Sequence, residues 1–248
     1  PKHAVLNAEI ARVAALAADS ASNVHWFNHA DGWHAKGHRL YKGEDDVLDL
    51  RSLPMPGQHN AGNVCAALAA IDALGLDAKS LAPYVQSFQP LPHRLQNIGE
   101  RGDVQFINDS ISTTPFASIA ALECFSHRKA AVLVGGYDRG LDWQAFADYV
   151  KQHPPSAIIC MAQNGPRIHE LLQKSGVGDK SQLTQAADMQ QAVTQALQSL
   201  NGDGVVLLSP GAPSFGHYAD YVERGRHFAE ISGFDPNHIS KIPGLGLG

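Results

Sequence analysis

Three short polar segments follow apolar stretches of the chain and contain the side chains best suited to bind a small charged ligand. They are 108–110 (Asn-Asp-Ser), 135–140 (Gly-Gly-Tyr-Asp-Arg-Gly) and 209–214 (Ser-Pro-Gly-Ala-Pro-Ser). If the apolar stretches are parallel strands, these segments meet at the carboxyl edge of one sheet, which is where open α/β sheets bind ligands. We therefore expect a ligand-binding cleft at this edge.

Two of these segments offer partners for the carboxylates of an amino acid. Arg139 stands beside Gly140 in a loop whose backbone can approach a ligand closely, and a guanidinium can form two parallel hydrogen bonds to a carboxylate. Ser214, with the backbone amides at the start of the following helix, suits a second carboxylate. The pair fits a dicarboxylic amino acid. The plainer alternative is that Arg139 is a solvated loop residue.

Asp109 stands where a buried strand is expected to end, so its carboxylate could accept hydrogen bonds from ribose hydroxyls or from a ligand amine. The alternative is a helix cap. Thr113 or Thr114, just before Pro115, is better placed to cap the next helix, because proline is favoured in a first helical turn.

Two further sites suggest nucleotide recognition. Asn60 and Asn63 are three residues apart and share one helix face, and asparagine amides match the donor and acceptor edge of adenine. The alternative is that Asn60 serves only as a helix N-cap. Arg94 follows Pro92 at an expected domain junction, where it could reach a nucleotide phosphate or pair with an acid of the interface.

The second part of the chain alternates between strands and helices. This alternation predicts βαβ units and a mostly parallel sheet with right-handed crossovers. The expected strands are 104–107, 130–134, 157–161, 182–184 and 205–208, and the expected helices are 115–125, 143–151, 167–174, 189–200 and 218–231.

The first part reads differently. We expect a strand at 4–7, a helix at 8–18, a short strand at 25–27, a β-meander over 31–53, and helices at 60–74 and 78–87. Pro90 and Pro92 disfavour helix on both sides of the segment between these parts. The sequence therefore predicts two α/β domains, 1–92 and 93–248.

Composition excludes several classes of protein. The 248 residues are 44% hydrophobic, which supports a packed core, and 19 basic against 24 acidic residues give a net charge of −5, which disfavours an electrostatic nucleic-acid binder. Three separated cysteines without metal-ligand spacing are typical of a reduced cytoplasmic protein. We expect no membrane span and no metal site in this chain, and we expect a monomer. The phosphate loop G-x-x-x-x-G-K-[ST], the dinucleotide motif G-x-G-x-x-G and the hydrolase elbow G-x-S-x-G are absent.

Six strings in fixed order resemble one known family, the Mur ligases. They are GQHNAGN at 57–63, LPHR at 91–94, INDS at 107–110, VLVGGYDRG at 132–140, LLSPGAPSF at 207–215 and YVERGRHF at 221–228. The resemblance extends over the whole chain. It implies that residues 1–92 are the end of the family's central ATPase α/β domain and that residues 93–248 are its Rossmann-like C-terminal domain.

The resemblance implies an ATP-dependent reaction that forms an amide bond. ATP phosphorylates the alanyl carboxylate of UDP-N-acetylmuramoyl-L-alanine, and the amine of glutamate displaces phosphate from the acyl phosphate, in cytoplasmic synthesis of a peptidoglycan precursor. The family pattern assigns nucleotide contacts to Asn60, Asn63, Arg94 and Asp109. It assigns the incoming amino acid to Thr113, Arg139, Ser214 and Tyr221, and it makes Arg94, Asp109 and Arg139 the catalytic set.

One position separates two branches of the family. Members that add D-glutamate often have a lysine at the position of Ile111. The isoleucine of this chain therefore lacks the cation that those members have beside the amino-acid pocket. The string NDSISTTP and the C-terminal FDPNHISKIPGLG are similar to the variant ligases that add L-glutamate, and we favour that substrate. The alternatives are a D-glutamate ligase, a ligase of the folylpolyglutamate synthase branch, and a non-catalytic module that binds a nucleotide or an amino acid.

The resemblance also implies that important groups lie outside this chain. The family's phosphate loop, its uridine-binding domain and most of its Mg²⁺ ligands would precede residue 1. We therefore expect the 248 residues to be about the second half of an enzyme and to be inactive by themselves.

Overall fold

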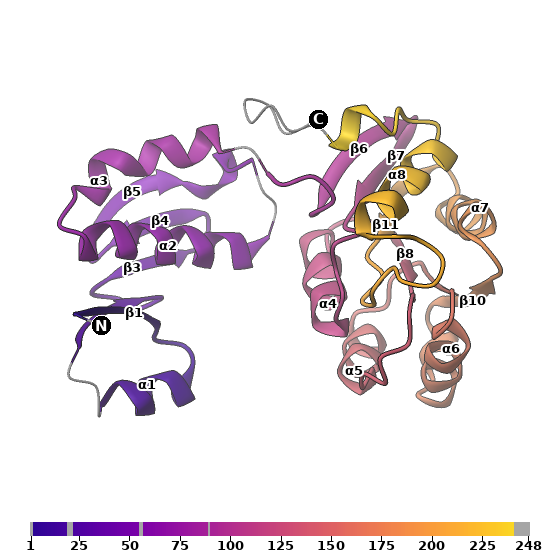
Figure 1. Ribbon diagram of the computed structural model, residues 1–248, viewed down its shortest axis with the longest axis horizontal. Coiled ribbons are helices and arrows are strands. Elements are labelled where there is room, and N and C mark those ends of the chain that lie inside the picture. Colours follow the sequence, from indigo (N-terminus) through magenta and orange to yellow (C-terminus); the bar gives the residue numbers. More distant parts are fainter. Residues whose placement is uncertain (1, 19–21, 55–56, 89, 241–248) are drawn as a thin grey trace. The chain divides into compact units, whose positions relative to one another are not determined.

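The computed structural model describes residues 2–18, 22–54, 57–88 and 90–240 (Figure 1). The chain divides into two compact units, unit 1 (Pro1–Gln89) and unit 2 (Pro90–Gly248). The boundary between the two units, after residue 89, lies three residues before the domain boundary predicted between residues 92 and 93. Each unit is described by itself.

Unit 1 is a mixed five-stranded sheet with helices. Its strands run in the order β1-β2-β3-β4-β5; the β1–β2 and β2–β3 pairs are parallel, and β3 to β5 form the predicted antiparallel meander. The elements are β1 (His3–Asn7), α1 (Ala11–Ala18), β2 (Asn23–Phe27), β3 (Trp33–Lys36), β4 (Arg39–Lys42), β5 (Asp45–Asp49), α2 (Gln58–Ala73) and α3 (Ala78–Leu81), with 3₁₀ turns at Leu50–Ser52 and Ala82–Ser87.

Helix α2 packs against β1, β2 and β3, and a buried tryptophan joins it to the sheet. The indole N–H of Trp33 donates to Asp72 Oδ2 at 2.7 Å, and Lys42 Nζ lies 2.6 Å from the same oxygen. The expected helix over 78–87 is wrong in part. It continues beyond Leu81 only as a 3₁₀ turn, because Pro83 has no N–H for an α-helical bond.

Unit 2 is a six-stranded sheet in the order β10-β9-β8-β11-β7-β6, in which every pair is parallel except β6–β7. The predicted, mostly parallel α/β sheet is therefore confirmed. The elements are β6 (Gln96–Arg101), β7 (Asp103–Asn108), α4 (Pro115–Cys124), β8 (Ala130–Val134), α5 (Gln144–Gln152), β9 (Ala157–Met161), α6 (Gly165–Lys174), β10 (Gln182–Ala186), α7 (Met189–Leu200), β11 (Asp203–Leu208) and α8 (Tyr221–Ile231), with 3₁₀ turns at Val177–Asp179 and His238–Ser240.

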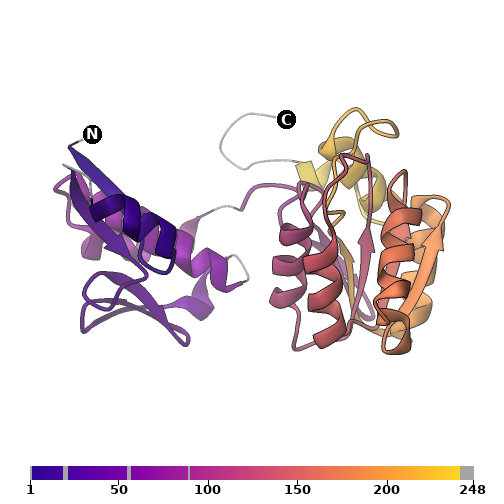
Figure 2. The same cartoon turned by 90° about the horizontal axis from the view of Figure 1, so that it is seen from below.

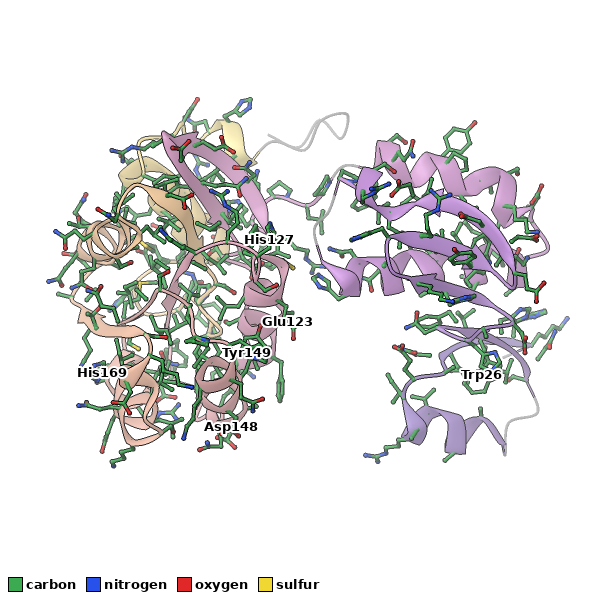
Figure 3. The ribbon with its side chains drawn as sticks, turned by 180° about the vertical axis from the view of Figure 1, so that it is seen from behind. Trp26, Glu123, His127, Asp148, Tyr149 and His169 are labelled. Carbon is green, nitrogen blue, oxygen red and sulfur yellow. The ribbon has the colours of Figure 1, made fainter. Side chains whose placement is uncertain are left out.

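Helices cover both faces of this sheet (Figure 2). Helices α4, α5 and α6 pack on one face with Val132 of β8, and α7 and α8 pack on the other face with Leu133. Glu123 of α4 and Tyr149 of α5 mark the neighbouring pair of helices in Figure 3. Because successive side chains of a strand point to opposite faces, the inner strands β8 and β9 are apolar along their whole length, as is typical of a sheet buried on both sides.

Strand β11 lies between β7 and β8, although it is the last strand of the sheet in sequence. The segments after β7 and β8 lead to α4 and α5 on one face, whereas the segment after β11 leads to α8 on the other. Connections that diverge to opposite faces open a crevice at the carboxyl ends of the strands. The topology therefore places a switch point at the end of β11.

The entry into unit 2 is a strained bend around Arg94. His93 (φ 62°) and Leu95 (φ 44°) both adopt left-handed backbone, which costs about 1–3 kcal/mol per residue. The backbone N–H of Leu95 donates to Asp109 Oδ1 at 3.1 Å, and Ile111 N–H donates to the His93 carbonyl at 3.1 Å. These bonds hold the bend against the first strand-end loop.

The His93 ring is buried inside this bend. Asn108 Nδ2 lies 2.9 Å from its Nδ1, and Ser240 Oγ lies 3.3 Å from its Nε2, an arrangement that a neutral ring protonated on Nε2 satisfies. Burial lowers the pKa of His93 to about 4. Gly225 is required beside the ring, because a Cβ there would lie 2.2 Å from His93 Nδ1.

Core packing in unit 2 predicts that two phenylalanines contribute very differently to the free energy of unfolding. Phe228 of α8 is fully buried against Phe106, whereas Phe116 of α4 is 68% exposed. Phe228→Ala should lower the free energy of unfolding by about 3–5 kcal/mol, since it leaves a cavity in the core. Phe116→Ala is the matched control and should change it by less than about 1 kcal/mol. Urea unfolding measures both, and equal losses would contradict the packing described.

The buried His93 predicts that acid destabilises unit 2. The unfolded chain protonates this histidine below about pH 6.5, while the folded chain does so only near pH 4. Stability attached to His93 is therefore lost as the pH falls from 6.5 to about 4, by up to about 3 kcal/mol. His93→Asn, which tolerates left-handed backbone, should be less stable at pH 7 but lose less on acidification.

Urea unfolding at pH 7, 5.5 and 4.5 measures this difference. The exposed His127, labelled in Figure 3, supplies the control, and His127→Asn should follow the unmodified chain. A pH dependence that His93→Asn shares with the unmodified chain would show that His93 is not the group responsible.

Candidate functional site

The three polar segments singled out in the sequence lie next to one another. They follow β8, β11 and β7, which are adjacent parallel strands and so present their carboxyl ends at one edge. We call them the β8 loop (135–143), the β11 loop (209–220) and the β7 loop (109–114). Their convergence was predicted from the strand pattern alone.

Backbone hydrogen bonds join the β8 and β11 loops. Gly135 N–H donates to the Pro210 carbonyl at 2.8 Å, and Tyr137 N–H donates to the Pro213 carbonyl at 2.8 Å. Gly136 has no room for a side chain, since a Cβ would lie 2.2 Å from the Pro213 oxygen. Gly136 is therefore required for the close approach of the two loops, whereas a Cβ on Gly135 would lie 2.1 Å from the Met161 oxygen at the end of β9.

Asn164, at the start of α6, holds the β8 loop from the other side. Its Oδ1 accepts from Gly136 N–H at 2.8 Å, and its own N–H donates to the Gly136 carbonyl at 3.1 Å. The side chain is buried, so these bonds are shielded from water. The result is a rigid loop with fixed backbone positions.

A cavity of about 500 Å³ opens beside these loops, a size typical of small-molecule sites. Its lining comes from the ends of β8, β9, β10 and β11 and is a mixture of apolar groups with a few polar ones. Tyr137 and Phe215 stand at an edge-to-face angle, with ring centres 6.4 Å apart, among the lining residues. The polar members are Gln163, Asp188, Ser214, His217, Tyr218, Arg224 and His227.

Of the residues predicted to hold the amino acid, Ser214 lines this cavity. Its carbonyl accepts the N–H of Tyr218, and its side chain is almost fully buried. Thr113, Arg139 and Tyr221 belong to the same edge of unit 2 but do not line the cavity. Tyr221 is 38% exposed, with its ring edge-on to His93 at 5.9 Å.

Arg139 is exposed, and none of the described residues forms an ion pair with it. Its neighbour Asp138 is occupied by Arg167, whose Nη2 lies 2.7 Å from Asp138 Oδ1. This guanidinium lowers the pKa of Asp138 and keeps the carboxylate charged. Arg139 is therefore a cation at the sheet edge that remains available to an anionic ligand.

Asp109 is placed differently from the prediction that it faces a ribose. It is 3% exposed, and both of its oxygens have protein donors: Leu95 N–H on Oδ1, and the hydroxyls of Ser112 and Ser209 on Oδ2. Burial raises the pKa of Asp109 despite these bonds. In this conformation its carboxylate joins the Arg94 bend, the β7 loop and the β11 loop. The helix cap is Thr114, whose Oγ1 accepts from Ala117 N–H.

Arg224 of α8 is the residue that the sequence reasoning did not single out. It lies within the string YVERGRHF, yet in a charged helical segment an arginine is expected to face solvent. It is instead 2% exposed and lines the cavity. The adjacent Gly225 allows α8 to approach His93 and Asn108 closely. A glycine inside a helix is the sequence signal of close packing that could have identified Arg224 as buried.

In unit 1 the two predicted asparagines stand together on α2. Asn63 Nδ2 donates to Asn60 Oδ1 at 3.3 Å, which confirms that they share one face of the helix. The alternative that Asn60 is the N-cap is wrong, because Gly57 occupies that position. In unit 2, Arg94 is exposed, and its charge acts on the Asp109 carboxylate.

The described residues contain neither a cluster of metal-ligand side chains nor a helix that could cross a membrane. No three His, Cys, Asp or Glu side chains in 2–18, 22–54, 57–88 and 90–240 come together as metal ligands. Over the same ranges, no helix combines the length and the apolar character needed to cross a membrane.

The sequence of unit 2 matches a known domain. Residues 93–211 match the family described as Mur ligase, glutamate ligase domain. Over all 248 residues the chain is 53% identical to the UDP-N-acetylmuramoyl-L-alanine–L-glutamate ligase of Xanthomonas oryzae pv. oryzae, of which it covers 53%. The Micromonospora enzyme of the same name is 34% identical over 231 residues, which are 91% of this chain and 49% of that protein. The chain thus spans about half the length of the curated relatives that it matches.

Solved structures share the fold. MurF from Acinetobacter baumannii superposes with a TM-score of 0.69 and 19% identity, over 88% of this chain and 50% of that one. Folylpolyglutamate synthase from Mycobacterium tuberculosis superposes with a TM-score of 0.61 and 16% identity, over 85% and 53%. These structures show the fold; the sequence match over 93–211 and the identity along the whole chain lead to one conclusion: unit 2 contains the glutamate ligase domain of the Mur ligases.

Proposed function

We propose that these residues are part of an ATP-dependent ligase that adds L-glutamate to UDP-N-acetylmuramoyl-L-alanine in cytoplasmic peptidoglycan precursor synthesis. The observation that carries the proposal is the 53% identity, along the whole chain, to relatives with that named activity. Because the chain covers about half of those relatives, the full reaction is proposed for these residues together with the remainder that the relatives possess. The chain alone is expected to be inactive.

The proposed reaction has two steps. The alanyl carboxylate takes the γ-phosphoryl group of ATP, which yields an acyl phosphate and ADP. The amine of L-glutamate then attacks the carbonyl carbon, and the tetrahedral intermediate expels phosphate to leave an amide. Mg²⁺ would neutralise phosphate charge. Since the described residues contain no metal-ligand cluster, no step is assigned to a metal site in this chain.

The edge of unit 2 supports a role in holding the incoming amino acid. We propose that Arg139 binds a carboxylate of L-glutamate and that Ser214 binds the other, with Thr113 and Tyr221 completing the site. The exposed Arg139 forms no ion pair with any of the described carboxylates, and its neighbour Asp138 is held by Arg167. The β8 and β11 loops that carry Arg139 and Ser214 are bonded together.

Nucleotide contacts are proposed for the remaining predicted residues. Asn60 and Asn63 present amide groups on one face of α2 for the adenine, and the exposed Arg94 would meet a phosphate. Asp109 is proposed to act on the nucleotide through the Arg94 bend, because both of its oxygens are already bonded within unit 2. This replaces the direct ribose contact expected from the sequence.

The choice of glutamate enantiomer tests the function. A chimaera in which this chain replaces the matching residues of the Xanthomonas oryzae relative should release phosphate from ATP when given UDP-N-acetylmuramoyl-L-alanine and L-glutamate. D-glutamate should be used at least about tenfold less well, because a stereocentre is read by several fixed contacts at once. Preference for D-glutamate would disprove the assigned substrate. Absence of turnover with either enantiomer in a folded chimaera would disprove the activity.

The role of Arg139 is tested in the same chimaera. Arg139→Met should raise the KM for L-glutamate roughly 10- to 100-fold, since a charge-assisted hydrogen bond is worth about 1.5–3 kcal/mol. Arg139→Lys keeps the cation and should lose less. The control is Arg128→Met, which removes an arginine that contacts Asp103 and Asp203 at the amino ends of the strands. If Arg139→Met and Arg128→Met give the same KM, Arg139 does not bind the substrate.

A further inference from the structure

Arg224 donates three hydrogen bonds that join two separate loops. Its Nε donates to Ser110 Oγ at 3.0 Å and its Nη2 to the Ser110 carbonyl at 2.7 Å. Its Nη1 donates to the Ala212 carbonyl at 3.0 Å. One guanidinium from α8 therefore binds the β7 loop and the β11 loop at the same time.

This side chain is costly to bury, which argues against a neutral packing role. None of the described carboxylates forms an ion pair with Arg224, and burial lowers its pKa to about 10. It still carries a full charge at neutral pH; its hydrogen-bond acceptors are carbonyl and hydroxyl oxygens, and Tyr218 and Asp109 act on the charge only through space. An apolar residue of similar volume would avoid the desolvation of the charge. The planar guanidinium is instead suited to fixing several acceptors in set directions.

The surroundings leave the guanidinium little freedom. A Cβ on Gly136 would lie 3.0 Å from Arg224 Nη1, so the β8 loop packs directly on the group. The Ser110 backbone N–H is in turn held by Asn108 Oδ1, and Ser110 Oγ donates to the Tyr221 carbonyl at 2.8 Å. The three loops and the start of α8 thus surround a single charged group.

We propose that Arg224 is a positioning residue of the amino-acid site: its buried guanidinium sets the distance between the loop that carries Thr113 and the loop that carries Ser214. Ser110 lies three positions before Thr113, and Ala212 lies two positions before Ser214, so each acceptor fixes the backbone next to a predicted substrate ligand. This inference rests on the proposed function of that site. Arg224 acts through the loops that it joins.

Amide hydrogen exchange of the ligand-free 248-residue chain tests the positioning. In Arg224→Met, the amides of 109–113 and 211–214 should exchange at least about tenfold faster, because these loops lose their common anchor. Amides of β9 and β10 should keep their rates. Arg226→Met, which removes a half-buried arginine of the same helix that bonds to Asn237 and to neither loop, should leave both loops unchanged. Unchanged loop exchange in Arg224→Met, or a uniform rise over all of unit 2, would overturn the inference.

Arg224→Lys separates the geometry of the guanidinium from its charge. Lysine keeps the cation but cannot direct donors at three fixed acceptors, so it should restore only part of the loop protection. In the chimaera described above, Arg224→Lys should raise the KM for L-glutamate by at least about threefold while the KM for ATP stays unchanged. Full restoration by lysine would overturn the positioning role.

The two proposals fail in different ways. If the unmodified chimaera does not use glutamate, the proposed function fails, and with it the assignment of Arg224 to an amino-acid site. If the unmodified chimaera uses L-glutamate and Arg224→Met retains both its loop protection and its KM, only the positioning role fails.

Discussion

The site depends on the insertion of β11 between β7 and β8. Its backbone pairs in parallel with both neighbours, from Asp203↔Asp103 to Leu208↔Asn108 on one side and from Val205↔Ala130 to Leu208↔Leu133 on the other. This register fixes where each strand ends, so three loops distant in sequence start at one level. A shift of register by one residue would turn the side chains of β11 to the opposite faces and move its loop away from the others.

Beyond the strands, the loops are held by buried polar groups. Asp109, Asn164 and Arg224 are each at most 3% exposed, and each bonds to a loop other than its own. Leaving one of their partners unpaired away from water would cost about 1–3 kcal/mol, so alternative loop arrangements are disfavoured. The loops can therefore be rich in glycine and still hold fixed positions. That combination allows close backbone approach to a ligand without a loss of order at the site.

The elements with simple physical signals were predictable from the sequence. Apolar stretches identified β8, β9 and β11, and Pro115 after Thr114 identified the start of α4. Strand β6 was not predicted, because it is a polar edge strand with a register shift around Gly99, against which the Phe234 ring packs closely. Edge strands need only one bonded neighbour, so their sequences carry little alternation.

Burial of charge was the part of the site that local sequence could not predict. Arg224 and Arg139 have the same side chain, but Arg224 is buried through its bonds to Ser110, which lies 114 positions away in the sequence. Asp109 was correctly placed at a strand end, but its hydroxyl partner Ser209 begins the β11 loop, 100 positions away in the sequence. Ser214 was easier to predict, because it lies in the loop that follows β11.

The two arginines at this edge of the sheet, Arg224 and Arg139, place positive charge in two different environments, one buried and one exposed. None of the described carboxylates forms an ion pair with Arg224. Its fixed positive charge therefore contributes to the electrostatic potential of the cavity that it lines. Arg139 is exposed, and the nearest acid in sequence, Asp138, is bonded to Arg167. A surface ion pair of this kind adds little to stability. Its effect here is to hold the carboxylate next to Arg139 in the sequence, so that Asp138 pairs with Arg167 and leaves the Arg139 guanidinium exposed.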